Sequence, residues 1–114
     1  MKKLTELRLQ SDCFLWHYNT YPEERKRLFM VHNTPRHKVD GAGLRAAGMI
    51  AGVADLQYLR LNRPPLFMEM KLPKQKQKPK QIIWQAVAEA TGAIYVVCDN
   101  LEDFKALIEE YRKN

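Results

Sequence analysis

The run LFMEMK, residues 66–71, decides the fold, because it sets a carboxylate and an ammonium inside an apolar stretch typical of a buried strand. Side chains alternate between the two faces of a strand, so Glu69 and Lys71 share a face with Phe67, and the two methionines take the other face. Charged side chains in a buried strand are costly unless they are paired or functional. The run therefore predicts a polar site on one face of a sheet.

A second carboxylate, Asp55, comes shortly before this strand. Residues 53–61 alternate as a strand, and residues 62–65 (NRPP) predict a turn, so the two strands are expected to pair as an antiparallel hairpin. That pairing brings Asp55 beside Glu69. Two carboxylates are hard oxygen ligands of the kind that Mg²⁺ prefers, and Lys71 adds a cation next to them.

The remaining segments predict an α/β (α+β) domain with a mixed central sheet flanked by helices, in the order αβ(α)ββαβα. Apolar periodicity predicts helices over residues 4–18, 81–92 and 101–111, and a short helix over about 41–47 that Asp40 caps and Gly48 ends. Short apolar runs predict buried strands over residues 28–32 and 93–98. With no interdomain linker, residues 1–114 are expected to form one domain.

The composition is that of a soluble globular protein, with 46% hydrophobic and 28% charged residues. Nineteen Lys and Arg against thirteen Asp and Glu give a net charge of +6, which suits a nucleic-acid partner or a solubilising surface. We expect no membrane partner, since no apolar run is long enough to span a bilayer and the N-terminus has no signal peptide. Cys13 and Cys98 are expected to be reduced thiols of a cytoplasmic protein, in preference to a disulfide.

The segment that follows the charged strand is strongly basic and contains two prolines. It is either a solvated loop or an extended loop that contacts phosphates, and its position directly after Glu69 and Lys71 favours the second. A shorter basic segment precedes the predicted short helix. The predicted DNA-binding residues are Lys74, Lys76, Lys78, Lys80, Arg36, His37 and Lys38.

These motifs resemble those of the virus-type replication-repair nuclease family (VRR-NUC) within the PD-(D/E)xK superfamily, and the resemblance spans nearly the whole chain. One departure is Ala54, where the family usually has a proline. That proline shapes the backbone and carries no ligand atom, so the departure leaves the chemistry possible. The matching positions are Gly48, Gly52, Asp55, Glu69, Lys71, Gln81 and Gly92, with Glu6 in an early helix and His32-Asn33 at a strand end.

The resemblance implies a restriction-endonuclease-like core and metal-dependent DNA endonuclease activity. Asp55 and Glu69 are then ligands of Mg²⁺ or Mn²⁺, with the backbone carbonyl of Met70, and Lys71 orients or deprotonates the attacking water. Gln81 is expected to position Lys71 or the phosphate.

Two further assignments have simpler alternatives. Glu6 is assigned to a second metal or its water, but a first-turn acid is also favoured by the helix dipole alone. His32 and Asn33 either line the site or have structural roles.

The resemblance also implies partners and setting. Small stand-alone members are phage or bacterial proteins that cut branched DNA, such as four-way junctions, as homodimers. This predicts a cytoplasmic protein of a bacterium or phage-infected host, with a helicase or replication protein as a candidate partner. The aromatic N-terminal helix, with Phe14, Trp16 and Tyr18, is either the dimer surface or core.

Three alternatives stay open: a catalytically silent nucleic-acid-binding module, a structural subunit of a particle or complex, and a nuclease for RNA or linear single strands.

Overall fold

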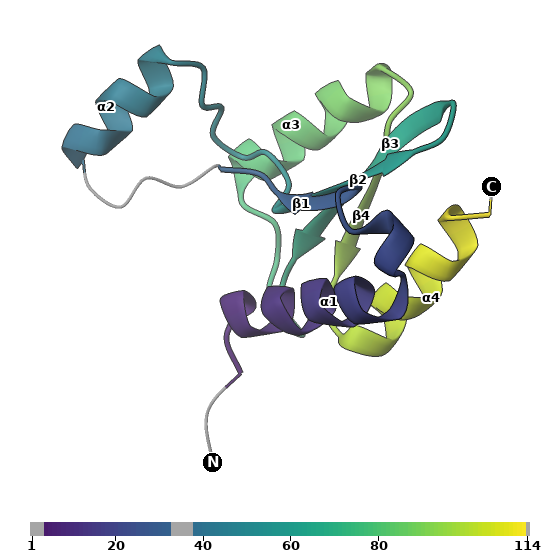
Figure 1. The fold of residues 1–114 in the computed structure, drawn as a ribbon. Coiled ribbons are helices and arrows are strands. Elements are labelled where there is room, and N and C mark those ends of the chain that lie inside the picture. The colour runs from purple at the N-terminus through teal and green to yellow at the C-terminus, as the bar shows by residue number, and fades with distance from the viewer. Residues whose placement is uncertain (1–3, 33–37, 114) are drawn as a thin grey trace.

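The chain forms a four-stranded mixed sheet with helices on both faces, as Figure 1 shows. The computed structural model describes residues 4–32 and 38–113. Strands β1, β2 and β3 are antiparallel neighbours, and β4 runs parallel to β3. The predicted fold class is confirmed. The elements are α1 (Glu6–Thr20), a 3-10 helix η1 (Pro22–Glu24), β1 (Leu28–Met30), α2 (Lys38–Ala46), β2 (Leu56–Arg60), β3 (Arg63–Met70), α3 (Pro79–Ala90), β4 (Ile94–Cys98) and α4 (Leu101–Tyr111).

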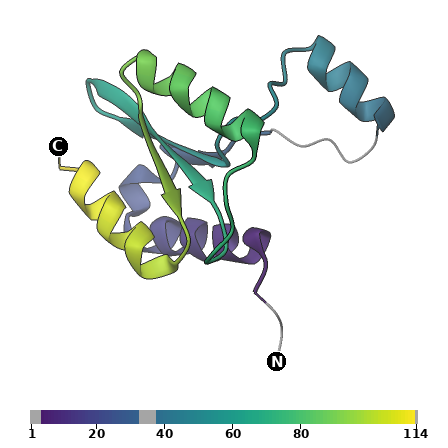
Figure 2. The ribbon, with the colours of Figure 1, turned by 180° about the vertical axis from the view of Figure 1, so that it is seen from behind.

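The helices form two layers around the sheet, which Figures 1 and 2 show from opposite sides. Helix α3 covers one face, and α1 and α4 cover the other. Parallel neighbours need a crossover connection, and α3 provides it between β3 and β4. Helix α2 stands apart from the two layers in both views.

The main core lies between the sheet and the pair α1 and α4. The alternation predicted for β3 holds, because Met68 and Met70 are fully buried in this core. The other buried members of the cluster are Leu9, Cys13, Leu28, Leu56, Tyr58, Leu66, Cys98, Phe104 and Ile108. Glu69 and Phe67 therefore face α3, where Phe67 packs edge-on against Trp84 with ring centroids 4.9 Å apart.

Several predicted boundaries were wrong: the elements predicted at residues 4–18, 53–61 and 81–92 are Glu6–Thr20, Leu56–Arg60 and Pro79–Ala90, and three further differences have local causes. Strand β1 spans only three residues at the sheet edge, and only Leu28 in it is buried. Helix α2 begins at Lys38, so Asp40 lies within it and does not cap it. The predicted turn is shorter, because Asn62 takes a left-handed φ of 56° and the chain re-enters the sheet at Arg63.

The two cysteines are free and buried. Burial raises the pKa of each thiol to about 12, so both are inert apolar side chains of the core. Within the described ranges, no helix combines the length and apolar character that crossing a bilayer requires.

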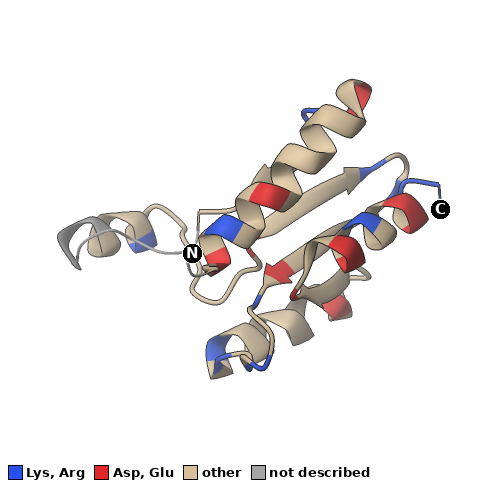
Figure 3. Cartoon of the chain, turned by 90° about the horizontal axis from the view of Figure 1, so that it is seen from below, with Lys and Arg blue, Asp and Glu red and all other residues tan. Residues whose placement is uncertain are grey.

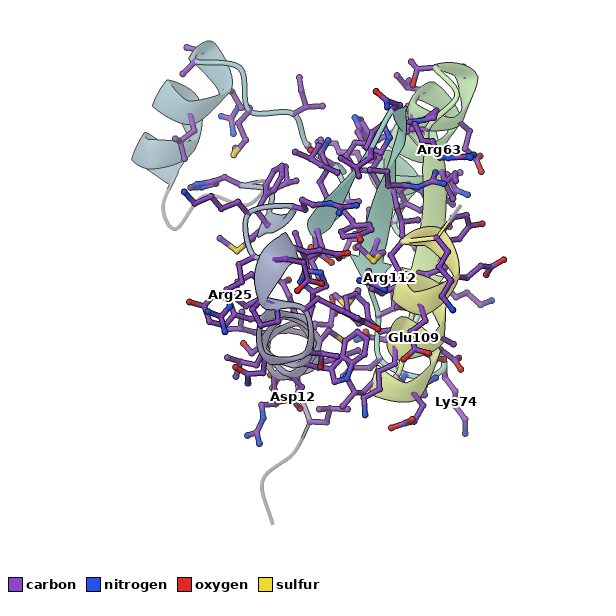
Figure 4. The ribbon with its side chains drawn as sticks, turned by 45° about the vertical axis from the view of Figure 1, so that its right-hand side comes forward. Asp12, Arg25, Arg63, Lys74, Glu109 and Arg112 are labelled. Carbon is purple, nitrogen blue, oxygen red and sulfur yellow. The ribbon has the colours of Figure 1, made fainter. Side chains whose placement is uncertain are left out.

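A buried carboxylate, Glu24, joins four elements on the α1 and α4 side. It accepts hydrogen bonds from the Tyr58 hydroxyl (2.6 Å) and from His17 Nε2 (3.1 Å). Arg112 Nε, at the end of α4, donates at 3.2 Å, and Arg27 lies 3.4 Å away. Figure 4 labels Arg112. Burial alone would raise the pKa of Glu24, but these hydrogen bonds and cations outweigh it and the pKa is lowered.

Candidate active site

The strand-borne carboxylates, the lysine and the glutamine predicted from the sequence meet in one pocket of about 570 Å³. Asp55 enters it from the start of β2, Glu69 and Lys71 from the end of β3, and Gln81 from the first turn of α3. The remaining residues that line the pocket are Glu6, Ala51, Gly52, Val53, Lys78, Pro79 and Lys80.

Backbone groups hold Asp55 in place. Its Oδ2 accepts a hydrogen bond from the Met70 N–H at 2.8 Å, and its backbone oxygen accepts one from the Val31 N–H at 2.8 Å. The register pairs Leu56 with Met68, so Asp55 lies opposite Glu69 at the next step of the antiparallel ladder. The hairpin therefore juxtaposes the two carboxylates, as the sequence predicts.

Glu69 is almost fully buried, and its two oxygens differ. Oε2 accepts a hydrogen bond from Gln81 Nε2 at 2.7 Å, whereas Oε1 finds no hydrogen-bond partner among the described residues. A buried oxygen without a partner costs free energy of the order of 1–3 kcal/mol. Oε1 is thus an acceptor that a bound cation would satisfy.

The electrostatics of the pocket disfavour the ionised form of Glu69. Burial is the largest cause and the negative charge of Asp55 the second, while the positive charge of Lys71 opposes them, and together they raise the pKa of Glu69 to about 8. A divalent cation would reverse this balance by stabilising both carboxylates. The pocket is therefore poised to exchange a proton for a metal ion.

Lys71 is 4% exposed and lies just beyond β3, where its N–H donates to the Cys98 carbonyl at 2.9 Å. This bond continues the parallel ladder for one more residue. It keeps Lys71 in strand alternation with Glu69, so both side chains face the pocket. A buried ammonium needs negative partners, and the carboxylate pair supplies them.

Gln81 makes two hydrogen bonds in the pocket, and its predicted contact with Lys71 or a phosphate stays a prediction. Its side-chain oxygen accepts a hydrogen bond from the Lys78 N–H at 2.7 Å and so satisfies a free donor at the start of α3. Its amide nitrogen donates to Glu69. Gln81 thereby fixes the rotamer of a carboxylate.

Gly52 explains part of the glycine motif before Asp55. Its φ is +88°, and a Cβ there would overlap the backbone carbonyl of Lys80. The chain that leads into β2 therefore packs directly on the first turn of α3. This contact brings the Asp55 side of the pocket against the Gln81 side.

The donor set fits Mg²⁺ or Mn²⁺, since it consists of two carboxylates, one of which has an unsatisfied buried oxygen, and carboxylate oxygens are the ligands these ions prefer. In the described ranges, no group of three or more His, Cys, Asp or Glu side chains is placed to hold a metal ion. Glu6 lines the pocket, but its role as a ligand stays a prediction, as does that of the Met70 carbonyl.

The predicted DNA-contacting lysines divide into two pairs. Lys78 and Lys80 line the pocket at the start of α3, whereas Lys74 and Lys76 are exposed in the loop before it. Figure 3 shows acidic residues gathered on α4, far along the chain from this loop. Lys78 and Lys80 thus place positive charge beside the carboxylates.

None of the remaining predicted site residues whose side chains the structure describes lines the pocket. His32 is exposed and is not among the described residues that line it. Asn33, Arg36 and His37 fall outside the described residues. Lys38 begins α2, and its side chain is also outside the description.

Comparison with known proteins establishes the fold. No protein-family model matches the sequence, and no curated protein matches it either. Among solved structures, a protein described as a "VRR_NUC domain protein" is similar, with a TM-score of 0.79 and 22% sequence identity. The similarity covers 99% of this chain and 92% of that chain. The chain has the fold of that VRR_NUC protein, and the resemblance found in the motifs is confirmed at the level of the fold.

Proposed function

We propose that the protein is a divalent-metal-dependent nuclease that hydrolyses phosphodiester bonds in DNA. The observation that supports this most strongly is the half-buried Asp55 beside the buried Glu69, with an unsatisfied Glu69 oxygen, next to a buried Lys71. The similarity to a VRR_NUC domain protein supports the same chemistry.

Each residue of the pocket has a defined task in this proposal. Asp55 and Glu69 would hold Mg²⁺ or Mn²⁺, and the bound ion would activate water and neutralise charge on the phosphate. Lys71, as a cation, orients the attacking water, favours its deprotonation and stabilises the additional negative charge of the transition state. Lys78 and Lys80 attract the phosphates on either side.

We further propose branched DNA as the preferred substrate, as the resemblance implies. We expect cleavage of a labelled four-way junction in Mg²⁺ or Mn²⁺, little cleavage of the matched linear duplex, and none in EDTA. Raising the salt concentration should weaken binding steeply, because the lysines displace counterions from DNA. Equal cutting of both DNAs would remove the branch preference. Salt-sensitive binding without cutting in any metal would indicate the silent binding module.

We also propose that the protein is a homodimer, and the exposed face of α1 supports this. Trp16 packs against Phe104 and belongs to the core, so the predicted aromatic surface is only partly exposed. Leu7 (69% exposed) and Leu15 (53% exposed) lie one turn on either side of Ser11. They border a groove of about 810 Å³ between α1 and β1, whose rim carries Arg25, labelled in Figure 4.

The spacing of this face is self-complementary. Leu7 and Leu15 each lie four residues from Ser11 on α1. A two-fold axis through Ser11 would place Leu7 of one copy against Leu15 of the other. Such isologous packing is what a symmetric dimer requires, and two sites related by a two-fold axis match a two-fold junction.

The dimer is tested by the mass in solution. We expect the wild-type chain to sediment as a dimer and Leu15→Glu as a folded monomer, because a charge placed in the apolar stripe opposes pairing. Leu61→Glu is the control, since Leu61 is exposed to 76% in the β2–β3 turn, away from this face. A wild-type monomer at tens of micromolar, or a dimer that survives Leu15→Glu, would contradict this interface.

A further inference from the structure

A second, apolar groove adjoins the carboxylate pocket. It has a volume of about 360 Å³ and shares Ala51 and Lys80 with that pocket. The other residues that line it are Ile50, Ile83, Trp84 and Val87, so Lys80 is its single charged residue among those described. The nuclease chemistry proposed above uses none of these apolar side chains.

The walls of this groove are held rigidly by the fold. Trp84 packs edge-on against Phe67 and lies 6.1 Å, centroid to centroid, from the Tyr95 ring. On the opposite wall, the close packing of Gly52 on the Lys80 backbone fixes the segment that carries Ile50 and Ala51. The groove therefore exists before any ligand binds, and filling it costs little rearrangement.

We propose that this groove binds one unstacked nucleobase of the DNA strand whose phosphate lies in the carboxylate pocket. A base offers a flat apolar face that stacks on aromatic and aliphatic side chains, whatever its identity. Lys80, at the boundary of the two pockets, is placed to pair with the phosphate between them. The small volume suits one planar group, since small-molecule pockets start at about 300 Å³.

This inference rests on the proposed nuclease function and extends it to substrate selection. In a continuous duplex every base is stacked and paired, and extracting one costs a few kcal/mol. At a branch point, bulge or flap a base is already unpaired, so binding it does not require this free energy. The groove would therefore select DNA in which an unpaired base adjoins the cleaved phosphate, without reading the sequence of that base.

Two neighbouring isoleucines on α3 provide a matched pair for the test. Ile83 (66% exposed) lines the groove, whereas Ile82 (54% exposed) does not. Both changes to Ser remove the same apolar side chain from the surface of one helix. Only a ligand in the groove distinguishes them, and Val87→Ser is a second variant of the lining.

The probe is a short duplex with one bulged 2-aminopurine, compared with the same duplex fully paired. In EDTA, which prevents cutting, we expect wild type and Ile82→Ser to change the fluorescence of the bulged base on binding. Ile83→Ser and Val87→Ser should bind the bulged DNA about fivefold more weakly, which corresponds to the lower end of the stacking contribution of one base. Affinity for the paired duplex should change less than about twofold in all three variants.

Cleavage of the same DNAs in Mg²⁺ reports the nuclease function separately from the groove. Equal affinities of Ile82→Ser and Ile83→Ser for the bulged DNA would overturn the base site even in an active nuclease. An effect of Ile83→Ser on the mass of the protein in solution, with unchanged DNA affinity, would also overturn it and indicate a protein partner.

Discussion

Replacing Glu69 by Gln is expected to abolish metal-dependent DNA cleavage, with a rate loss of about a thousandfold or more. The substitution keeps the shape of the side chain and an oxygen that can accept the Gln81 hydrogen bond of 2.7 Å. It removes the negative charge and the unsatisfied Oε1 carboxylate oxygen. Cleavage kinetics at saturating DNA, in Mg²⁺ and in Mn²⁺, measure this loss.

A matched change elsewhere on the fold separates the site from general effects. Glu89→Gln makes the same chemical change on an exposed residue near the end of α3, and its cleavage rate should equal that of wild type. Retention of more than about a tenth of the wild-type rate by Glu69→Gln would remove Glu69 from the mechanism.

The stability of Glu69→Gln without metal is a second, independent readout. The pKa of Glu69 is raised from 4.5 to about 8 in the folded chain, so the folded state binds the proton more tightly than the unfolded state. The stabilisation that the protonated Glu69 gives to the folded state is fully present below pH 4.5 and is lost as the pH rises through about 8. The free energy of unfolding of wild type should thus fall between pH 6 and pH 9, by about 2 kcal/mol relative to Glu69→Gln. Parallel pH profiles of the two proteins would show that burial does not hold the proton on Glu69.

Replacing Glu24 by Ala is expected to destabilise the protein by about 3–5 kcal/mol, the cost of removing one partner from a buried ionic cluster. Glu24 is 3% exposed, and its loss leaves the buried Tyr58 hydroxyl and His17 ring without their acceptor. It also leaves Arg112 and Arg27 without the carboxylate they share. Urea unfolding monitored by tryptophan fluorescence measures the change.

The neighbouring residue is the control for this prediction. Glu23 also pairs with Arg112, at 3.3 Å, but its side chain is 64% exposed. Glu23→Ala should cost less than about 1 kcal/mol, as exposed ion pairs do. Because the pKa of Glu24 is lowered, its contribution is present above pH 4.5 and is lost as the pH falls through its folded-state pKa. Equal destabilisation by the two substitutions at pH 7 would contradict the role assigned to Glu24.

The central hairpin and the carboxylate pair could be predicted because their signals are local. Alternation along residues 66–71 assigns Glu69 to one face, and a short link forces β2 and β3 to pair. Helix α4 was also predicted at its observed bounds, Leu101–Tyr111, since Asn100 caps it and an apolar stripe defines its inner face. Gly92 ends the predicted helix at α3 with a φ of +91°.

The features that the sequence did not reveal depend on contacts between distant residues. Glu24 stands in a charged connector, and only the folded chain brings Tyr58 and Arg112 to it. Gln81 could be assigned to the site from its motif, but its partner depends on how α3 docks on β3. The apolar groove at Ile83 likewise joins two segments about thirty residues apart, and no pattern within either segment indicates it.

The double hydrogen bonding of Gln81 couples the start of the crossover helix to the orientation of Glu69. Asp55 and Glu69 leave the ribosome before Gln81 does, because they precede it in the chain. A nascent chain that has folded only its hairpin therefore has two adjacent carboxylates but no group to set the rotamer of the second. In the proposed nuclease, the complete site would then form in one late step, when α3 docks on the sheet. An incomplete or truncated chain of such a nuclease would have no assembled centre with which to cut DNA.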